Sequence, residues 1–233
     1  MASFVLVHGA WHGGWCWARV ARLLRDAGHD VFTPTLTGLG ERAHLARPEI
    51  DLAHHVQDVL AVLEAEELKS VTLCGHSYGG MVVTGVAARA AARVAHLVYL
   101  DAFVPAPGQA LLDLTAPERA EAMREAARSQ GEGWRVPPWK PEQYGVTSAR
   151  DIEWLGRRLT PHPLRTLEQA AEAGPPAKVK LSYVYCAKTA TRSFDQFAGR
   201  LREDRKWSFH ELKTGHDAMV TTPGDVARIL MNR

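Results

Sequence analysis

The amino-acid sequence predicts a doubly wound α/β fold, in which helices cover both faces of a mostly parallel sheet. Short β-rich runs alternate with longer helical patterns along most of the chain, which is the order that such a sheet produces. The first run, residues 4–8, is a continuous apolar strand, as expected for a strand buried on both faces. One stretch, residues 103–174, breaks the alternation, and we expect it to form a small helical cap. At 233 residues, the chain fits one domain over residues 1–233.

The elements before the cap are bounded by helix and strand signals. Gly28 closes a first helix as its C-terminal stop, and Pro34 ends a second strand. Asp51 is a good N-cap for a helix whose apolar side chains share one face. In chain order, we expect a helix at 15–27, a strand at 30–33, a helix from residue 51, a strand at 71–74, a helix at 80–91 and a strand at 95–100.

The segment 103–174 is rich in proline, tryptophan and charged helix-forming residues. Structureless connections of this length are rare in compact domains, so we expect helices within it, at 117–128 and near 148–158. The cap should cover the strand ends, where open parallel sheets bind ligands. After it, we expect strands at 181–185 and 207–212 and a last helix near Pro223.

Composition and charge argue against several classes of protein. Lysine and arginine exceed aspartate and glutamate by 28 − 26 = 2, and the basic residues are scattered, so we expect no nucleic-acid partner. The start of the chain has no signal-peptide pattern, and no apolar run is long enough for a bilayer, which predicts a cytoplasmic protein without a membrane partner. Cys16, Cys74 and Cys186 lie far apart in apolar surroundings and predict packed, reduced thiols. We find no Cys or His pair with the spacing of metal ligands except the adjacent His54 and His55, and neighbours on a helix point apart, so no metal site is expected.

A candidate nucleophile follows the strand at 71–74. The motif Gly75-His76-Ser77-Tyr78-Gly79 lies between a predicted strand and a predicted helix, which is the setting that a G-x-S-x-G nucleophile turn requires. The serine of such a turn is held in a strained backbone conformation, so the positions two before and two after it must lack side chains that would collide. The turn also places Ser77 at a helix N-terminus, where the helix dipole favours developing negative charge.

The candidate general base is His216. A serine hydroxyl needs a base to take its proton, and the pKa of histidine lies near the working pH. His216 follows the last predicted strand and precedes the last helix, so it arrives last in the chain order serine, acid, histidine. An oxyanion in the reaction needs two donors. We assign the backbone N–H of Tyr78, just after the nucleophile, and that of Ala10, in the loop after the first strand.

Three segments together carry a resemblance to a known family: FVLVHGAWHGGWCW at 4–17, GHSYGGM at 75–81 and GHDAM at 215–219. The chain resembles the plant methyl-ester esterase and hydroxynitrile lyase branch of the α/β-hydrolases, with its bacterial esterase relatives. The likeness covers the core and is weak across the cap. It implies a hydrolase without a cofactor, commonly dimeric, that acts on small esters. Hydroxynitrile lyases of this branch have Thr and Lys where this chain has Gly9 and Asp217, which favours the esterase side.

The acid of the triad departs from this branch. The branch places an Asp in the loop after the penultimate strand, but here that loop, CAKTATRS at 186–193, has no carboxylate. Asp195 follows slightly later, and Asp101 ends the strand that comes after the nucleophile helix. An acid at either place can orient the same imidazole, because geometry defines the triad. We favour Asp101 on its strand position and keep Asp195 as the alternative.

The expected function is a serine hydrolase that cleaves a small carboxylic ester through a Ser77, His216 and Asp101 triad and an acyl-enzyme. Carbamates and amides are alternative substrates of the same constellation. A lyase or secondary-metabolism tailoring enzyme, in which Ser77 only positions substrate, and a non-catalytic ligand receptor are the rival functions. The candidate substrate-binding residues are Trp11, His12, Phe103, Trp134, Trp139 and Trp154.

Overall fold

The computed structural model describes residues 1–232 and contains a six-stranded sheet in the order β2-β1-β3-β4-β7-β8. All neighbouring pairs in this sheet are parallel. The strands are β1 Ser3–Val7, β2 Asp30–Phe32, β3 Val71–His76, β4 Val94–Leu100, β7 Lys180–Cys186 and β8 Trp207–Leu212. The predicted doubly wound, mostly parallel α/β fold is confirmed.

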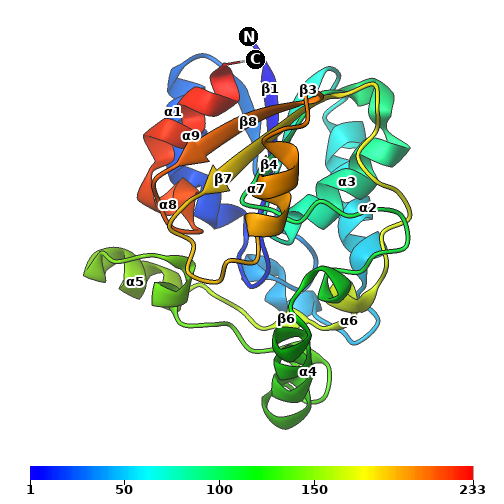
Figure 1. Cartoon of the computed structure of the whole chain (residues 1–233), viewed down its shortest axis with the longest axis vertical. Coiled ribbons are helices and arrows are strands. Elements are labelled where there is room, and N and C mark those ends of the chain that lie inside the picture. Colours follow the sequence, from blue (N-terminus) through cyan, green and yellow to red (C-terminus); the bar gives the residue numbers. More distant parts are fainter. Residues whose placement is uncertain (233) are drawn as a thin grey trace.

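Helices lie on both faces of the sheet (Figure 1). One group consists of α1 Ala18–Asp26, α8 Ala218–Thr221 and α9 Pro223–Met231, and the other contains α2 Leu52–Ala65 and α3 Gly79–Arg89. The helix α7 Asp195–Leu201 connects β7 to β8. The helix expected at 15–27 begins instead as a 3-10 turn at Gly14–Trp17, so α1 starts three residues later than the prediction, at Ala18.

The strand order reverses between β1 and β3. The chain runs from β1 outward to β2, returns to β3 on the other side of β1, and then adds β4, β7 and β8 in that direction. The carboxyl ends of the strands on either side of such a reversal border a crevice in which open α/β sheets bind ligands. The segments that follow β1 and β3 carry Ala10 and Ser77. The topology therefore brings these two sequence regions to one edge of the sheet.

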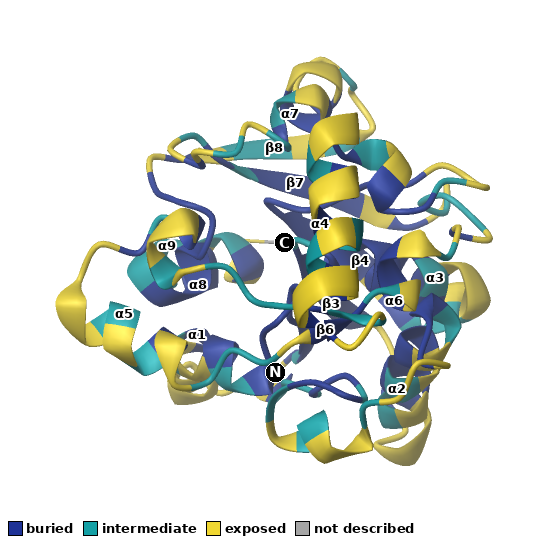
Figure 2. Cartoon of the chain, turned by 90° about the horizontal axis from the view of Figure 1, so that it is seen from below, coloured by how far each residue is buried: buried dark blue, intermediate teal, exposed yellow. Residues whose placement is uncertain are grey.

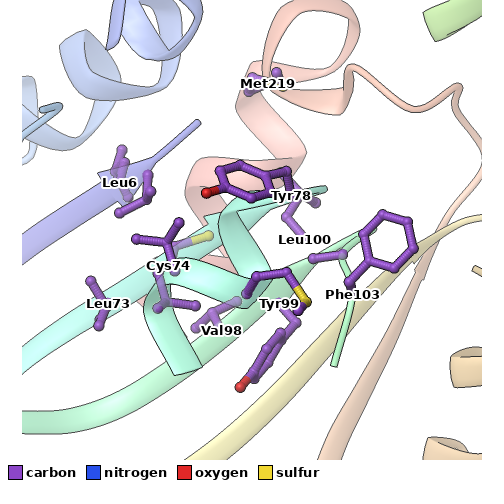
Figure 3. Close-up of a cluster of buried hydrophobic side chains, with 14 of the residues drawn as sticks. Leu6, Leu73, Cys74, Tyr78, Val98, Tyr99, Leu100, Phe103 and Met219 are labelled. Carbon is purple, nitrogen blue, oxygen red and sulfur yellow. The ribbon is translucent and has the colours of Figure 1, made fainter. Parts of the chain in front are cut away.

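The core lies between the sheet and its helices. Figure 3 shows one cluster of buried side chains, which includes Leu6 of β1, Leu73 of β3, Val98 of β4, Tyr78 and Phe103. A fully buried Leu or Val contributes about 1.5–3 kcal/mol to folding. Cys16, Cys74 and Cys186 are free and buried, as predicted. The core thus forms a rigid base under the loops at the carboxyl edge.

Residues 103–174, which we call the cap, lie beyond the carboxyl ends of the strands (Figure 1). Its helices are α4 Pro117–Gln130, α5 Ala149–Gly156 and α6 Arg165–Glu168. The expectation of a purely helical cap is incomplete, because β5 Arg135–Val136 and β6 His162–Pro163 form an antiparallel pair within it. Pairs this short show no alternating pattern in the sequence. One side of α4 is exposed along its length (Figure 2).

Several contacts tie the cap to the core, two of them at the loops that follow β1 and β8. The indole Nε1–H of Trp11 donates to the carbonyl of Val136 at 2.9 Å. Gly145 of the cap packs against Gly215, so closely that a Cβ on Gly145 would lie 2.6 Å from the Gly215 Cα. The second contact places the cap beside the loop that carries His216. Within residues 1–232, no helix is both long enough and apolar enough to cross a membrane.

Candidate active site

Ser77 lies in the sharp turn between β3 and α3. Its φ of 54° is in the left-handed region, which costs a residue with a side chain about 1–3 kcal/mol. The turn leaves no room for side chains around it: a Cβ on Gly75 would lie 2.5 Å from the Gly79 carbonyl oxygen, and one on Gly80 would lie 2.1 Å from that of Phe103. Hydrogen bonds hold the strained peptide, because Ser77 N–H donates to Leu100 and Phe103 N–H donates to the Ser77 carbonyl. The predicted strand-turn-helix context of Ser77 is therefore present.

His216 is hydrogen-bonded to Asp101. Its Nδ1 lies 2.7 Å from the Oδ2 atom of Asp101, which is fully buried. Asp101 itself sits just past β4 with a φ of 42°. Its other partners come from the loop after β7: the Cys186 N–H donates to Oδ1 at 3.1 Å, and the Thr189 hydroxyl donates to Oδ2 at 2.7 Å. The loop that lacks a carboxylate thus supplies donors to a carboxylate from the neighbouring strand.

Asp195, the alternative acid, lies elsewhere. Its carboxylate accepts a hydrogen bond from the Tyr185 hydroxyl at 2.5 Å and pairs with Arg192. The side chain is 33% exposed, against 0% for Asp101. Of the two candidate acids, the structure places only Asp101 against His216.

A buried ion pair lies next to the two loops that carry Ala10 and His216. His12 Nε2 lies 3.0 Å from Asp217 Oδ2, and His12 Nδ1 lies 2.7 Å from the Ala10 carbonyl oxygen. Both partners are acceptors, so both ring nitrogens must carry a proton. Burial works against this charge, but the Asp217 carboxylate and the two hydrogen bonds outweigh it, and the pKa of His12 is raised. The pair joins the Ala10 loop to the His216 loop.

Replacing His12 with glutamine should make the stability difference from wild type depend on pH. The loss should be on the order of 3 kcal/mol near pH 6, because Asp217 stays buried without its cation. The folded-state pKa of His12 is raised, so its contribution is complete below the unfolded value of about 6.5 and is lost as pH rises through the folded value. Urea denaturation of both proteins from pH 5.5 to 9 measures this difference. A constant difference across that range would show that His12 is not charged.

His76 supports His216 by a different contact. Its Nε2 lies 3.1 Å from the His216 carbonyl oxygen, and the two ring centroids are 4.4 Å apart. Burial, followed by the charge of His216, lowers the pKa of His76 well below the ordinary value, so it donates to this carbonyl as a neutral ring. One donor atom from each of His76, His216 and Asp217 lies within 4.8 Å of the others, close enough to hold a metal ion. Spacing could not indicate this set, because His76 and His216 are 140 residues apart.

Two backbone amides near Ser77 have no acceptor within residues 1–232. They are the N–H groups of Ala10 and Tyr78, the pair assigned to an oxyanion. Both residues line the same pocket as Ser77. Gly9 brings the first loop against the nucleophile turn, since a Cβ there would lie 2.9 Å from the Ser77 Cβ. The Tyr78 ring is held away from the amide by a 2.8 Å hydrogen bond between its hydroxyl and His55.

A single pocket collects these groups. It has an empty volume of about 480 Å³, and Ala10, Ser77, Tyr78 and His216 all lie in its wall. The cap supplies a further part of the lining, including Leu111, Arg119, Met123 and Leu167. Sequence reasoning missed these four, although the spacing of Arg119 and Met123 places them on one face of α4.

Of the predicted substrate-binding residues, Trp11, Phe103 and Trp139 line this pocket. The other three lie away from it. His12 is buried behind the pocket on Asp217, and Trp154 packs its ring edge-on against Trp15 beneath Arg158. Trp134 stacks with Arg135. The prediction chose these residues by type, and aromatic residues are as useful for packing as for binding.

Comparisons with known proteins identify the family of the chain. Residues 4–229 match the alpha/beta hydrolase family. A carbendazim hydrolyzing esterase from Nocardioides sp. (strain SG-4G) is 42% identical, over 99% of this chain and 98% of that protein. A pheophorbidase from Raphanus sativus is 30% identical, over 96% and 90% of the two chains.

Solved structures show the same fold. An extracellular alpha/beta-hydrolase from a Paenibacillus species superposes with a TM-score of 0.81 at 24% identity, over 99% of this chain and 98% of the other. That protein shares structural and functional homology with tobacco salicylic acid binding protein 2. An Arabidopsis methylesterase, MES16, has a TM-score of 0.74 at 22% identity, over 99% of this chain and 98% of the other. The resemblance predicted from the three motifs is confirmed: the chain belongs to the α/β hydrolase family.

Proposed function

We propose that this protein is a serine hydrolase that cleaves small carboxylic esters through an acyl-enzyme. Ser77 is the nucleophile, His216 is the general base, and Asp101 holds the imidazole and stabilises its charged form. The amides of Ala10 and Tyr78 bind the oxyanion. Trp11, Phe103 and Trp139 offer an apolar surface to the substrate.

The reaction proceeds in two displacements. His216 takes the proton of Ser77 as its oxygen attacks the carbonyl carbon, and the carbonyl oxygen becomes an anion held by two N–H donors. The imidazolium then gives its proton to the leaving alcohol as the C–O bond breaks. A water molecule attacks the acyl-enzyme by the same route and releases the acid, which restores the Ser77 hydroxyl.

The observation that carries this proposal is the 2.7 Å hydrogen bond between Asp101 and His216, in a protein whose Ser77 and His216 line one pocket. It fixes the tautomer of His216, because Nδ1 must donate to the carboxylate and Nε2 is left as an acceptor. The strained Ser77 turn and the two unsatisfied amides complete the constellation. The esterase name of the relative at 42% identity supports an ester as substrate.

A fluorophosphonate probe tests the proposal. It phosphonylates an activated serine, so intact-mass measurement should show one adduct per chain, and peptide mapping should place it within residues 75–81. The same preparation should release a burst of 4-nitrophenol from 4-nitrophenyl acetate, equal to the enzyme concentration. Turnover without an adduct would mean that Ser77 only positions substrate, and would refute the acyl-enzyme.

A further inference from the structure

Arg119 is a cation in the wall of the pocket without an anionic partner. It lies on the first turn of α4 and is partly buried. Within the described chain, its guanidinium pairs with no carboxylate and donates no hydrogen bond. The central carbon of the guanidinium lies over the face of Trp139, 3.9 Å from the centroid of that ring. An arginine carries five N–H donors, so most of its binding capacity is unused.

The two other arginines of α4 behave differently. Arg124 pairs with Glu121 and Glu168, and Arg128 pairs with Glu121 and Glu125. Arg119 also occupies the end of the helix where the dipole disfavours a positive charge. Neither surface ion pairing nor helix stability therefore accounts for an arginine at this position.

The surroundings of Arg119 also disfavour a charged side chain. Its neighbours in the pocket include Leu111, Met123 and Trp139, which cannot accept a strong hydrogen bond. Burial lowers the pKa of Arg119, although the guanidinium remains charged at neutral pH. Stacking on Trp139 offsets part of the desolvation and holds the guanidinium plane in one orientation. The result is a positioned cation that faces an apolar pocket shared with Ser77.

We propose that Arg119 binds a carboxylate of the substrate, so that this pocket selects esters that carry a second, free carboxylate. A planar guanidinium pairs with a carboxylate through two parallel hydrogen bonds, which a neutral ester or alcohol cannot provide. Such substrates are half-esters of dicarboxylic acids or esters of carboxylated aromatic compounds. The inference rests on the proposed hydrolase function for the bond that is cleaved. The recognition of the carboxylate is independent of turnover.

Calorimetric titration separates recognition from catalysis. In the full-length Ser77→Ala protein, 3-phenylpropanoate and 3-phenylpropanamide have the same shape and differ in charge. We expect the carboxylate to bind about 10-fold or more tightly than the amide, which corresponds to one charge-assisted pair. Adding Arg119→Gln should bring the two affinities within about 2-fold of each other. Adding Arg128→Gln, on the same helix but outside the pocket, should leave the preference unchanged.

Hydrolysis provides the second measurement. With Ser77 intact, the mono-4-nitrophenyl esters of succinate, glutarate and adipate are compared with 4-nitrophenyl butyrate. At least one half-ester should have the higher kcat/KM, and Arg119→Gln should reduce that advantage by about 10-fold, mainly through KM. Arg128→Gln, which lies outside the pocket, should leave the rates on both kinds of ester unchanged.

The outcomes distinguish the two proposals. The inference is overturned if the carboxylate binds no more tightly than the amide, or if neither binds measurably. It is also overturned if the preference for the carboxylate persists in the Arg119→Gln variant. If any of these results is found and neutral esters are hydrolysed, the hydrolase proposal is retained and the carboxylate proposal fails. If the carboxylate preference is present and depends on Arg119 but no ester is hydrolysed, the recognition site stands and the hydrolase proposal fails.

Discussion

Replacing Ser77 with alanine should lower kcat for 4-nitrophenyl acetate by about 10⁵–10⁶-fold, because the attacking oxygen is removed and no other group can form the acyl-enzyme. The fold should survive, since the substitution deletes one oxygen. Alanine tolerates the φ of 54° no worse than serine does. The measurement is stopped-flow release of 4-nitrophenol, with circular dichroism to establish that the variant is folded.

Ser193 provides a matched control for this experiment. Ser193 lines the same pocket, but its backbone does not have the strained left-handed conformation of the Ser77 turn, and it does not lie between a strand and a helix N-terminus in a glycine-flanked motif. Ser193→Ala should therefore retain kcat within about 2-fold, as expected for a substitution that touches no reacting atom. If Ser193→Ala were the inactive variant and Ser77→Ala kept the burst, the nucleophile would have been assigned to the wrong serine.

Features that local sequence determines were predictable. The turn around Ser77 needs small residues at defined offsets, and Gly75, Gly79 and Gly80 supply them within six positions. Strands buried on both faces are near-continuous apolar runs, so β1 stands out without knowledge of the fold. The position of His216 followed from chain order alone. These signals require no knowledge of which residues meet in space.

Features that depend on contacts between distant segments were not predictable. His12 and Asp217 are 205 residues apart, and nothing in either neighbourhood shows that they form a buried ion pair. Trp154 and Trp139 are both cap tryptophans, yet only Trp139 faces the pocket. The choice between Asp101 and Asp195 was difficult for the same reason, because both residues follow strands that end at the same edge of the sheet. Only the arrangement of β4 beside β7 brings the first of them to His216.

Replacing Asp101 with asparagine should lower kcat by roughly 10³–10⁴-fold while the protein remains folded. The matched variant Asp195→Asn should keep kcat within about 2-fold, because its partners are Tyr185 and Arg192 at a partly exposed site. Pre-steady-state and steady-state assays on 4-nitrophenyl acetate measure both, and thermal unfolding checks that the losses are not due to instability. The reverse ranking of the two variants would transfer the triad acid to Asp195.

The loss of kcat expected for Asp101→Asn follows from the hydrogen-bond partners of the Asp101 carboxylate, all of which are donors. Oδ1 accepts from the Cys186 N–H, and Oδ2 accepts from the Thr189 hydroxyl and from His216. The new NH₂ group must face one of these two positions. The Cys186 amide is fixed in the backbone and cannot become an acceptor, whereas the Thr189 hydroxyl can rotate and the imidazole can move its proton. The NH₂ group therefore faces His216, whose proton moves from Nδ1 to Nε2. An Nε2 that already carries a proton cannot take one from Ser77, so activity is lost although every buried group keeps a partner.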